Sequence, residues 1–248
     1  MENYKEFLNR INSFEKKETS FGDEYFNGNP SIAHKVNADN SFKEFYGDTV
    51  VFDLDENTKK FIAECVAKLY EVAPECFPER LINSTFHMTL HDLSNSKNLS
   101  DVAVELFYNE LKVIDKIKTL DTRKIDVTSP INMKCKYIFN MVNTSLVMGL
   151  YPASEDDYSR LMELYNIFDD VKSLPYPLTP HITLAYYSIE GFDTESAGKL
   201  EKAILELNEN ISDVDVRLSI NNLYYQKFRS MNDYINVINI GKNIGKRL

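Results

Sequence analysis

The tetrapeptide His-x-Thr-Leu occurs twice in this chain, at residues 87–90 and at residues 181–184. The chain has four histidines in 248 residues, so half of them lie in this one motif. The copies are 181 − 87 = 94 residues apart, one in each half of the sequence. Alternate residues of a strand share a face, so each copy would direct an imidazole and a hydroxyl to the same side. The repeat therefore favours a fold in which two strands carry the same polar pair.

The surroundings of the motif are repeated as well. Hydrophobic periodicity predicts the same order of elements in both halves, with strands at 49–54 and 145–150, helices at 57–72 and 155–171, motif strands at 85–93 and 181–188, and second helices at 100–120 and 194–208. Ser100 and Ser154 are candidate caps for two of these helices. The repeats start 145 − 49 = 96 residues apart, close to the spacing of the motifs. The motif therefore belongs to a duplicated unit.

The other predicted elements complete the fold class. They are a helix at 4–15, a polar loop region to residue 40, strands at 124–127, 135–141, 214–218, 223–229 and 234–240, and a hairpin turn at 231–233. Short, β-branched, hairpin-linked strands favour antiparallel sheets. We therefore predict an α+β fold of two pseudo-symmetric lobes, with helices outside and both motif strands at a central cleft.

The predicted domains are an N-terminal extension and one bilobal domain. The extension covers residues 1–45 and either closes the cleft as a lid or packs on one lobe. The domain covers residues 46–248, with lobe one at about 46–142 and lobe two at about 143–248.

Composition restricts the partners. Hydrophobic residues make up 43% and charged residues 27% of the chain, and no apolar run is long enough to span a membrane. The net charge of −10 disfavours long duplex nucleic acid and favours a small or terminal phosphate. The three cysteines lack paired spacing, which indicates a reducing compartment. We expect a cytoplasmic monomer with no membrane partner.

The repeated residues suit phosphodiester chemistry without a metal. Imidazole titrates near pH ~6.5, so at neutral pH one of His87 and His181 can accept a proton while the other donates one. The hydroxyls of Thr89 and Thr183 can hold the non-bridging phosphate oxygens. The pseudo-symmetry leaves open which histidine is the acid. No glycine-rich phosphate loop is present, which argues against an ATP-driven enzyme.

The two motifs resemble those of the 2H phosphoesterase superfamily, also called LigT-like or 2′-5′ RNA ligase-like. Its pattern, His-x-Thr/Ser-x with x apolar, occurs twice, and residues 87–90 and 181–184 match it fully. The repeat spans roughly residues 46–240, and residues 45–50 are similar to an uncharacterised subgroup. The resemblance implies a bilobal fold and metal-independent phosphodiester chemistry without a cofactor.

The resemblance also implies a range of substrates. Members open 2′,3′-cyclic phosphates, hydrolyse cyclic phosphates on small nucleotides, cut 2′-5′ linkages or trim RNA 3′ ends. We expect a hydrolase acting on a small nucleotide or an RNA end. Two alternatives remain, namely a binding or sensor module without turnover and a phosphodiesterase for a non-nucleotide substrate.

His91 lies two residues beyond Thr89 and shares its face if the strand is regular. His87 and His91 could then be read as a metal pair, but Ala185 stands at the matching place in the second half and no third ligand is spaced nearby. We predict no metal site, and we expect His91 either to bind the substrate at the edge of the cleft or to have a structural role. We assign no role to His34.

Four further residues are candidates for substrate binding. Tyr46 and Tyr187 could offer a ring on which a base stacks, although ordinary packing is the commoner role of a tyrosine. Lys136 and Lys227 occupy comparable places in the two repeats and could supply positive charge to a phosphate, although a lysine on a strand is more often solvated.

Overall fold

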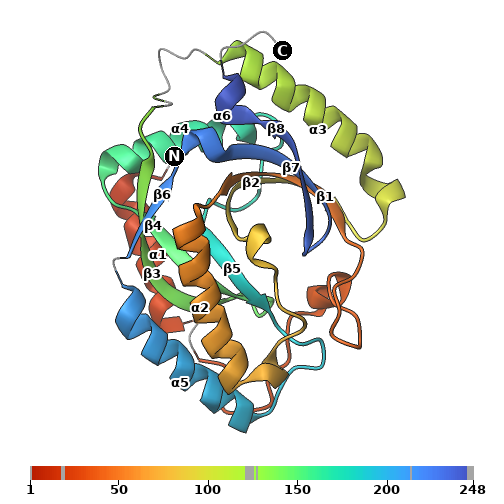
Figure 1. The fold of residues 1–248 in the computed structure, drawn as a ribbon, viewed down its shortest axis with the longest axis vertical. Coiled ribbons are helices and arrows are strands. Elements are labelled where there is room, and N and C mark those ends of the chain that lie inside the picture. Colours follow the sequence, from red (N-terminus) through yellow and green to blue (C-terminus); the bar gives the residue numbers. More distant parts are fainter. Residues whose placement is uncertain (1, 18–19, 121–125, 127, 213, 245–248) are drawn as a thin grey trace.

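The computed structural model describes residues 2–17, 20–120, 126, 128–212 and 214–244. Within these residues, eight strands form one antiparallel sheet in the order β6-β3-β4-β5-β2-β1-β7-β8. Their bounds are β1 Tyr46–Asp53, β2 His87–Ser96, β3 Ile131–Met141, β4 Ser145–Pro152, β5 His181–Tyr186, β6 Asp215–Leu218, β7 Leu223–Ser230 and β8 Asp233–Asn239. The sheet curls strongly, as Figure 1 shows.

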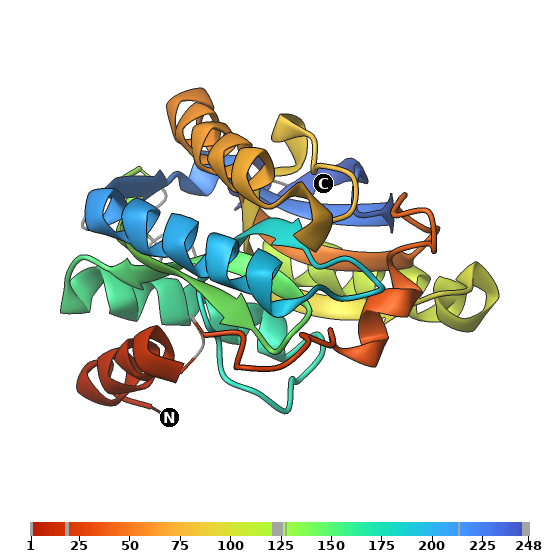
Figure 2. The same ribbon diagram turned by 90° about the horizontal axis from the view of Figure 1, so that it is seen from below.

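Helices cover the outside of the curled sheet. Their bounds are α1 Tyr4–Lys17, α2 Glu56–Val72, α3 Leu99–Thr119, α4 Glu155–Asp169, α5 Thr194–Ile211 and the short α6 Ile240–Asn243. Helices α2 and α5 lie side by side on one side of the molecule, whereas α4 and α1 lie on the other (Figure 2). The predicted α+β class, with antiparallel strands and helices outside, is confirmed.

The two halves of the sheet meet at the strands that carry the motifs. Strand β2 pairs with β5 at Met88 and Ile182, each the second residue of its motif. One half of the sheet is β2-β1-β7-β8 and the other is β5-β4-β3-β6. Strand β3 therefore lies beside β4, and β7 lies beside β1. The division of the sequence near residue 142 does not coincide with the division of the sheet.

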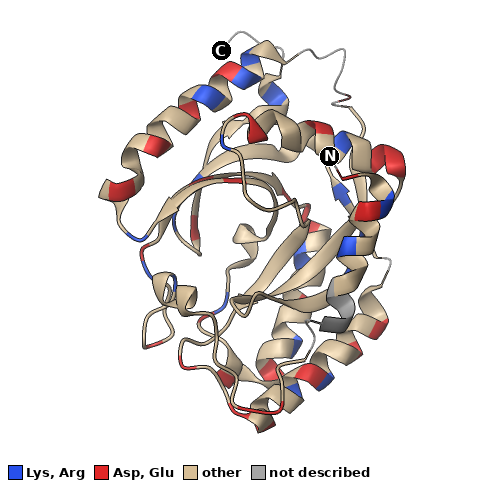
Figure 3. Ribbon diagram, turned by 180° about the vertical axis from the view of Figure 1, so that it is seen from behind, with Lys and Arg blue, Asp and Glu red and all other residues tan. Residues whose placement is uncertain are grey.

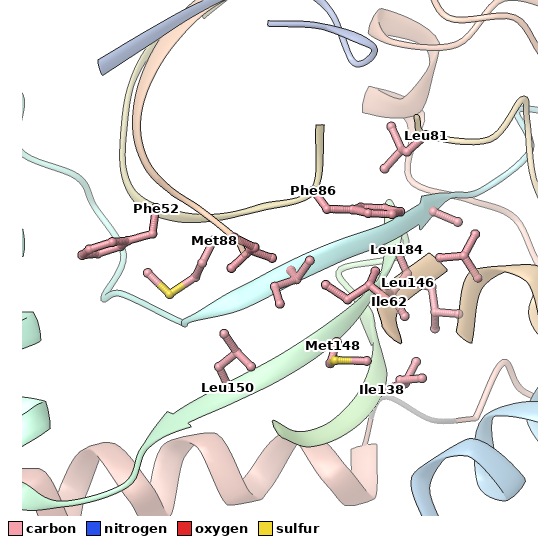
Figure 4. Packing of buried hydrophobic residues seen from close by; sticks show 14 of the residues in the cluster. Phe52, Ile62, Leu81, Phe86, Met88, Ile138, Leu146, Met148, Leu150 and Leu184 are labelled. Carbon is pink, nitrogen blue, oxygen red and sulfur yellow. The ribbon is translucent and has the colours of Figure 1, made fainter. Parts of the chain in front are cut away.

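The core lies behind the motif strands. Met88 on β2 and Met148 on β4 are fully buried, as is Ile62 on α2. Figure 4 shows these side chains packed together with Phe52 and Leu184 between the strands and the helices. Because side chains alternate across a strand, burying Met88 turns His87 and Thr89 to the opposite face.

A buried carboxylate on β1 joins that strand to three other elements, β2, α3 and β7. Asp48 on β1 is 1% exposed. Its Oδ1 accepts hydrogen bonds from Ser94 N on β2 at 2.8 Å and from Asn109 Nδ2 on α3 at 3.3 Å. Its Oδ2 accepts one from the Tyr225 hydroxyl on β7 at 2.9 Å. Burial raises the pKa of Asp48 to about 6, while the hydrogen bonds oppose the rise.

The segment between α1 and β1 is packed into the fold. Phe26 forms a bridge with Phe192, and Asn29 N donates to Asn143 O at 2.7 Å in the turn between β3 and β4. A 3-10 helix, Pro30–His34, follows and buries Ile32. The described part of the predicted extension therefore packs against the rest of the fold.

Most predicted elements are confirmed with small shifts at their ends. Ser154 caps α4 by accepting from Asp157 N, as predicted. The predicted cap Ser100 is wrong, because α3 already begins at Leu99 with Asn98 as the extended residue before it. The predicted strand 124–127 falls, except for Asp126, outside the described residues.

Charged residues gather on the helices, whereas the strands carry few of them (Figure 3). Of the helices described, none has both the length and the apolar character that crossing a bilayer requires.

Candidate active site

Both motifs face one cavity of about 380 Å³. Its lining includes His87 and Thr89 from β2 and His181 and Thr183 from β5. All four side chains are half-buried, because they lie on the face opposite the core. The structure thus brings the two repeated pairs together.

The two imidazoles are held in the same way. His87 Nδ1 lies 2.7 Å from Thr85 O, and His181 Nδ1 lies 2.7 Å from Thr179 O. A carbonyl oxygen can only accept a hydrogen bond, so Nδ1 carries the proton in both rings. Nε2 of each neutral ring is then left with a lone pair for proton transfer.

The surroundings favour the neutral form of both histidines. Burial lowers the pKa of His87 to about 4, and burial also lowers the pKa of His181. The bond to the backbone carbonyl and the charge of Asp92 oppose both shifts. The expectation of one protonated ring at neutral pH therefore depends on what occupies the cavity, since a bound anion favours the imidazolium.

A bulge at the last residue of each motif changes which of the following residues face the cavity. On β2, Val51 pairs with Thr89 and Val50 with His91, so Leu90 is the extra residue. On β5, Val147 pairs with Thr183 and Leu146 with Ala185, so Leu184 is the extra residue. The fourth residue of each motif is thus a buried bulge residue.

The bulge moves His91 away from the cavity, so its expected position on the face of Thr89 is wrong. The His91 Nδ1 lies 2.6 Å from Asp92 O, and its Nε2 lies 3.5 Å from Asp169 Oδ1. The centroids of the His91 ring and of the Tyr165 ring on α4 are 4.7 Å apart. His87 and His91 therefore do not converge on a metal. Among the described residues, no group of three His, Cys, Asp or Glu side chains is arranged as a metal site.

Asp92, the residue after His91, lines the cavity instead of His91. It is exposed to the cleft, and its Oδ2 accepts a hydrogen bond from the Tyr176 hydroxyl at 3.3 Å. In the other half, Tyr186 stands at the equivalent position after the bulge. Asp92 pairs with Thr49 and Tyr186 pairs with Ser145, and these two partners also line the cavity.

The four further candidates lie outside the cavity lining. Tyr187 is fully buried among Phe21, Phe26 and Phe192, and Lys227 binds Glu110 of α3 at 2.6 Å. The Nζ of Lys136 lies 5.7 Å from the centroid of the Tyr151 ring. Tyr46, at the start of β1, pairs with Ser96. We leave these four residues out of the proposed site.

Sequence reasoning missed the contribution of the segment before β1. Ser31, His34 and Lys35 all line the cavity, as does Phe45. Tyr234 on β8 also lines it, with its ring 5.1 Å from that of His87. None of these residues is repeated in the other half, and the repeat was the signal that found the motifs.

Comparisons with known proteins bear on the fold. No protein-family model matches the sequence, and no curated protein matches it either. Among solved structures, a conserved protein of unknown function, ATU0111 from Agrobacterium tumefaciens, is similar with a TM-score of 0.63 and 18% identity, over 85% of this chain and 92% of that chain. LigT from E. coli, in a complex with 3′-AMP, aligns with a TM-score of 0.47 and 13% identity, over 79% of this chain and 97% of that chain. The likeness to ATU0111 shows a shared fold.

Proposed function

We propose that this chain is a metal-independent phosphodiesterase. Its substrate is a nucleotide phosphodiester, namely a 2′,3′-cyclic phosphate, a cyclic nucleotide or a 2′-5′-linked oligonucleotide. The observation that carries the proposal is the matched pair of imidazoles, each fixed through Nδ1 at 2.7 Å from a carbonyl and each lining the same cavity. This is the arrangement that acid–base catalysis by two histidines requires.

Each histidine has one part of the reaction. Nε2 of the neutral ring accepts the proton of the attacking water while the new O–P bond forms. Nε2–H of the protonated ring gives its proton to the leaving oxygen while the old P–O bond breaks. The hydroxyls of Thr89 and Thr183 donate hydrogen bonds to the non-bridging oxygens as charge develops on them. Which ring starts as the acid is left open by the mirrored geometry.

The test is turnover of a panel of nucleotide phosphodiesters with EDTA present. We expect His87→Ala and His181→Ala each to lower kcat by at least roughly 100-fold, the usual contribution of a general acid or base. His91→Gln is the matched control, because this histidine lies on the same strand but outside the cavity, and it should keep wild-type rates. Thermal unfolding of each variant checks that the fold is intact.

Three results would contradict the proposal. One is near wild-type activity of either alanine variant. Another is loss of activity in EDTA that returns with added metal. The third is binding of the panel without product over hours, which would favour a sensor.

A further inference from the structure

The cavity is symmetric in its two motif histidines but not in the residues that flank them. Asp92 and Tyr186 occupy equivalent positions after the two bulges, and their strand partners Thr49 and Ser145 are 145 − 49 = 96 residues apart. One position carries a carboxylate. The other carries an aromatic ring, and the ammonium of Lys35 lies 4.9 Å from the centre of that ring.

Lys35 is held between two aromatic faces. Its Nζ lies 5.3 Å from the ring of Phe45 as well as 4.9 Å from that of Tyr186. It is the one lysine or arginine among the described residues that line the cavity, and no carboxylate of the described residues forms an ion pair with it. By contrast, Lys59 and Lys227 bind Asp53 and Glu110 at 2.7 and 2.6 Å. The charge of Lys35 is therefore available to a ligand.

The backbone fixes Lys35 in place. Its N–H donates to Ile32 O at 2.8 Å, which closes the 3-10 helix, and its carbonyl accepts from Lys43 N at 2.8 Å. Asn29 ties the start of the same helix to the turn between β3 and β4, and Phe45 N donates to Arg229 O at 2.9 Å. The segment is thus attached to both halves of the sheet, and these bonds hold its lining residues at the cavity.

We infer that Lys35 is the anion-binding residue of the cavity and that it orients the substrate. Phosphoryl oxygens bind at the Lys35 side, and hydrogen-bond donors of the nucleoside, its sugar hydroxyls or base amines, face Asp92. The substrate class is accordingly a nucleoside phosphate that enters in one direction, although the histidines alone would accept it in two. This inference rests on the proposed function for its catalytic consequence but not for the binding itself.

The experiment measures binding of two products of phosphodiester cleavage, adenosine 3′-monophosphate and inorganic phosphate, by calorimetry at low salt. Lys35→Met should weaken both affinities by roughly tenfold, because a charge-assisted hydrogen bond is lost. Lys35→Arg keeps the charge and should stay within about threefold of wild type. Lys136→Met is the matched control, since Lys136 also lies over a tyrosine but outside the cavity, and it should have no effect.

Asp92→Asn tests the orientation. The substitution removes the negative charge that repels an anion, so the affinity for inorganic phosphate should stay the same or rise. The affinity for adenosine should fall, because a charged acceptor for its hydroxyls or amine is lost.

The outcomes separate this inference from the proposed function. Weaker phosphate binding by Lys35→Met supports Lys35 as the anion-binding residue even if no phosphodiester is turned over. If a substrate is turned over but Lys35→Met leaves its KM and the phosphate affinity within twofold, the inference is wrong and the phosphodiesterase stands. Weaker phosphate binding by Asp92→Asn would overturn the assigned orientation.

Discussion

Each of the two motif histidines, His87 and His181, is oriented by a backbone carbonyl. A carboxylate in that place would stabilise the imidazolium strongly, whereas a carbonyl fixes the ring and adds little charge. Burial therefore dominates the pKa of both rings. This balance has a consequence for the dependence of activity on pH.

We expect the kcat/KM of the proposed reaction to be highest below pH 6.5. The productive free enzyme has one neutral and one protonated ring, and this form is most populated between the two pKa values. Because both values are lowered from 6.5, kcat/KM should fall as the pH rises from 6 to 8, approaching tenfold per unit. A bound anion raises the pKa of both rings, so kcat should hold to a higher pH than kcat/KM.

Steady-state kinetics across pH 4 to 9 on one cleaved substrate checks this expectation. An optimum of kcat/KM at pH 7.5 or above would contradict it.

The sequence was sufficient to find the histidines and threonines but not their neighbours in the cavity. The repeat exposed the two motifs, because chance rarely places one tetrapeptide twice in matching surroundings. Asp92 could not be predicted as a site residue, because the bulge at Leu90 places Asp92 instead of His91 on the face of Thr89, and this bulge has no clear sequence signal. Lys35 could not be predicted as a site residue, because it comes from a segment with no counterpart in the second half.

At the scale of elements, periodicity predicted the strands and helices well, but it could not predict strand partners. A pattern of alternating residues indicates that β7 is a strand, but it does not show with which neighbouring strand β7 pairs. Its place beside β1 depends on contacts such as that of Tyr225 with Asp48, which are 225 − 48 = 177 residues apart. The same network fixes α3 to the sheet through Asn109.

The Asp48 network predicts a pH-dependent stability. The pKa of Asp48 is raised from 3.8 to about 6 in the folded protein, so the folded state holds this proton more tightly than the unfolded state. Stability from this group is present below pH 4 and is lost as the pH rises through 6, by about 3 kcal/mol in total. Asp48→Asn removes this loss while keeping most hydrogen bonds. The variant should gain stability relative to wild type between pH 4 and 7.

Urea unfolding of both proteins at several pH values gives this difference directly. Asp115→Asn, at an exposed aspartate of α3, is the control and should show a constant difference from wild type. A constant difference for Asp48→Asn would contradict the prediction.

At the scale of the whole molecule, the halves of the sheet exchange strands. Strand β3, from the predicted lobe 46–142, lies between β4 and β6, and β7, from the predicted lobe 143–248, lies between β1 and β8. Neither half of the sequence can therefore complete its own half of the sheet.

We expect the fragments 1–142 and 143–248 to lack cooperative unfolding when they are produced separately. The first lacks the partners of β3, and the second leaves β6 and the β7–β8 hairpin without the strands they pair with. Mixed or produced together, they should form one complex with the mass of the full chain. Size-exclusion chromatography and circular dichroism check this. A cooperative thermal transition of either fragment alone would contradict it.

The exchange of strands also means that β1 is synthesised long before its partner β7. Strand β1 ends at Asp53 and its partner β7 begins at Leu223, so 223 − 53 = 170 residues separate them. At about 5–20 residues per second, the ribosome needs roughly 10 to 30 s to supply that partner. For that interval one edge of β1 lacks its partner and can pair with another chain, which favours aggregation of the growing chain.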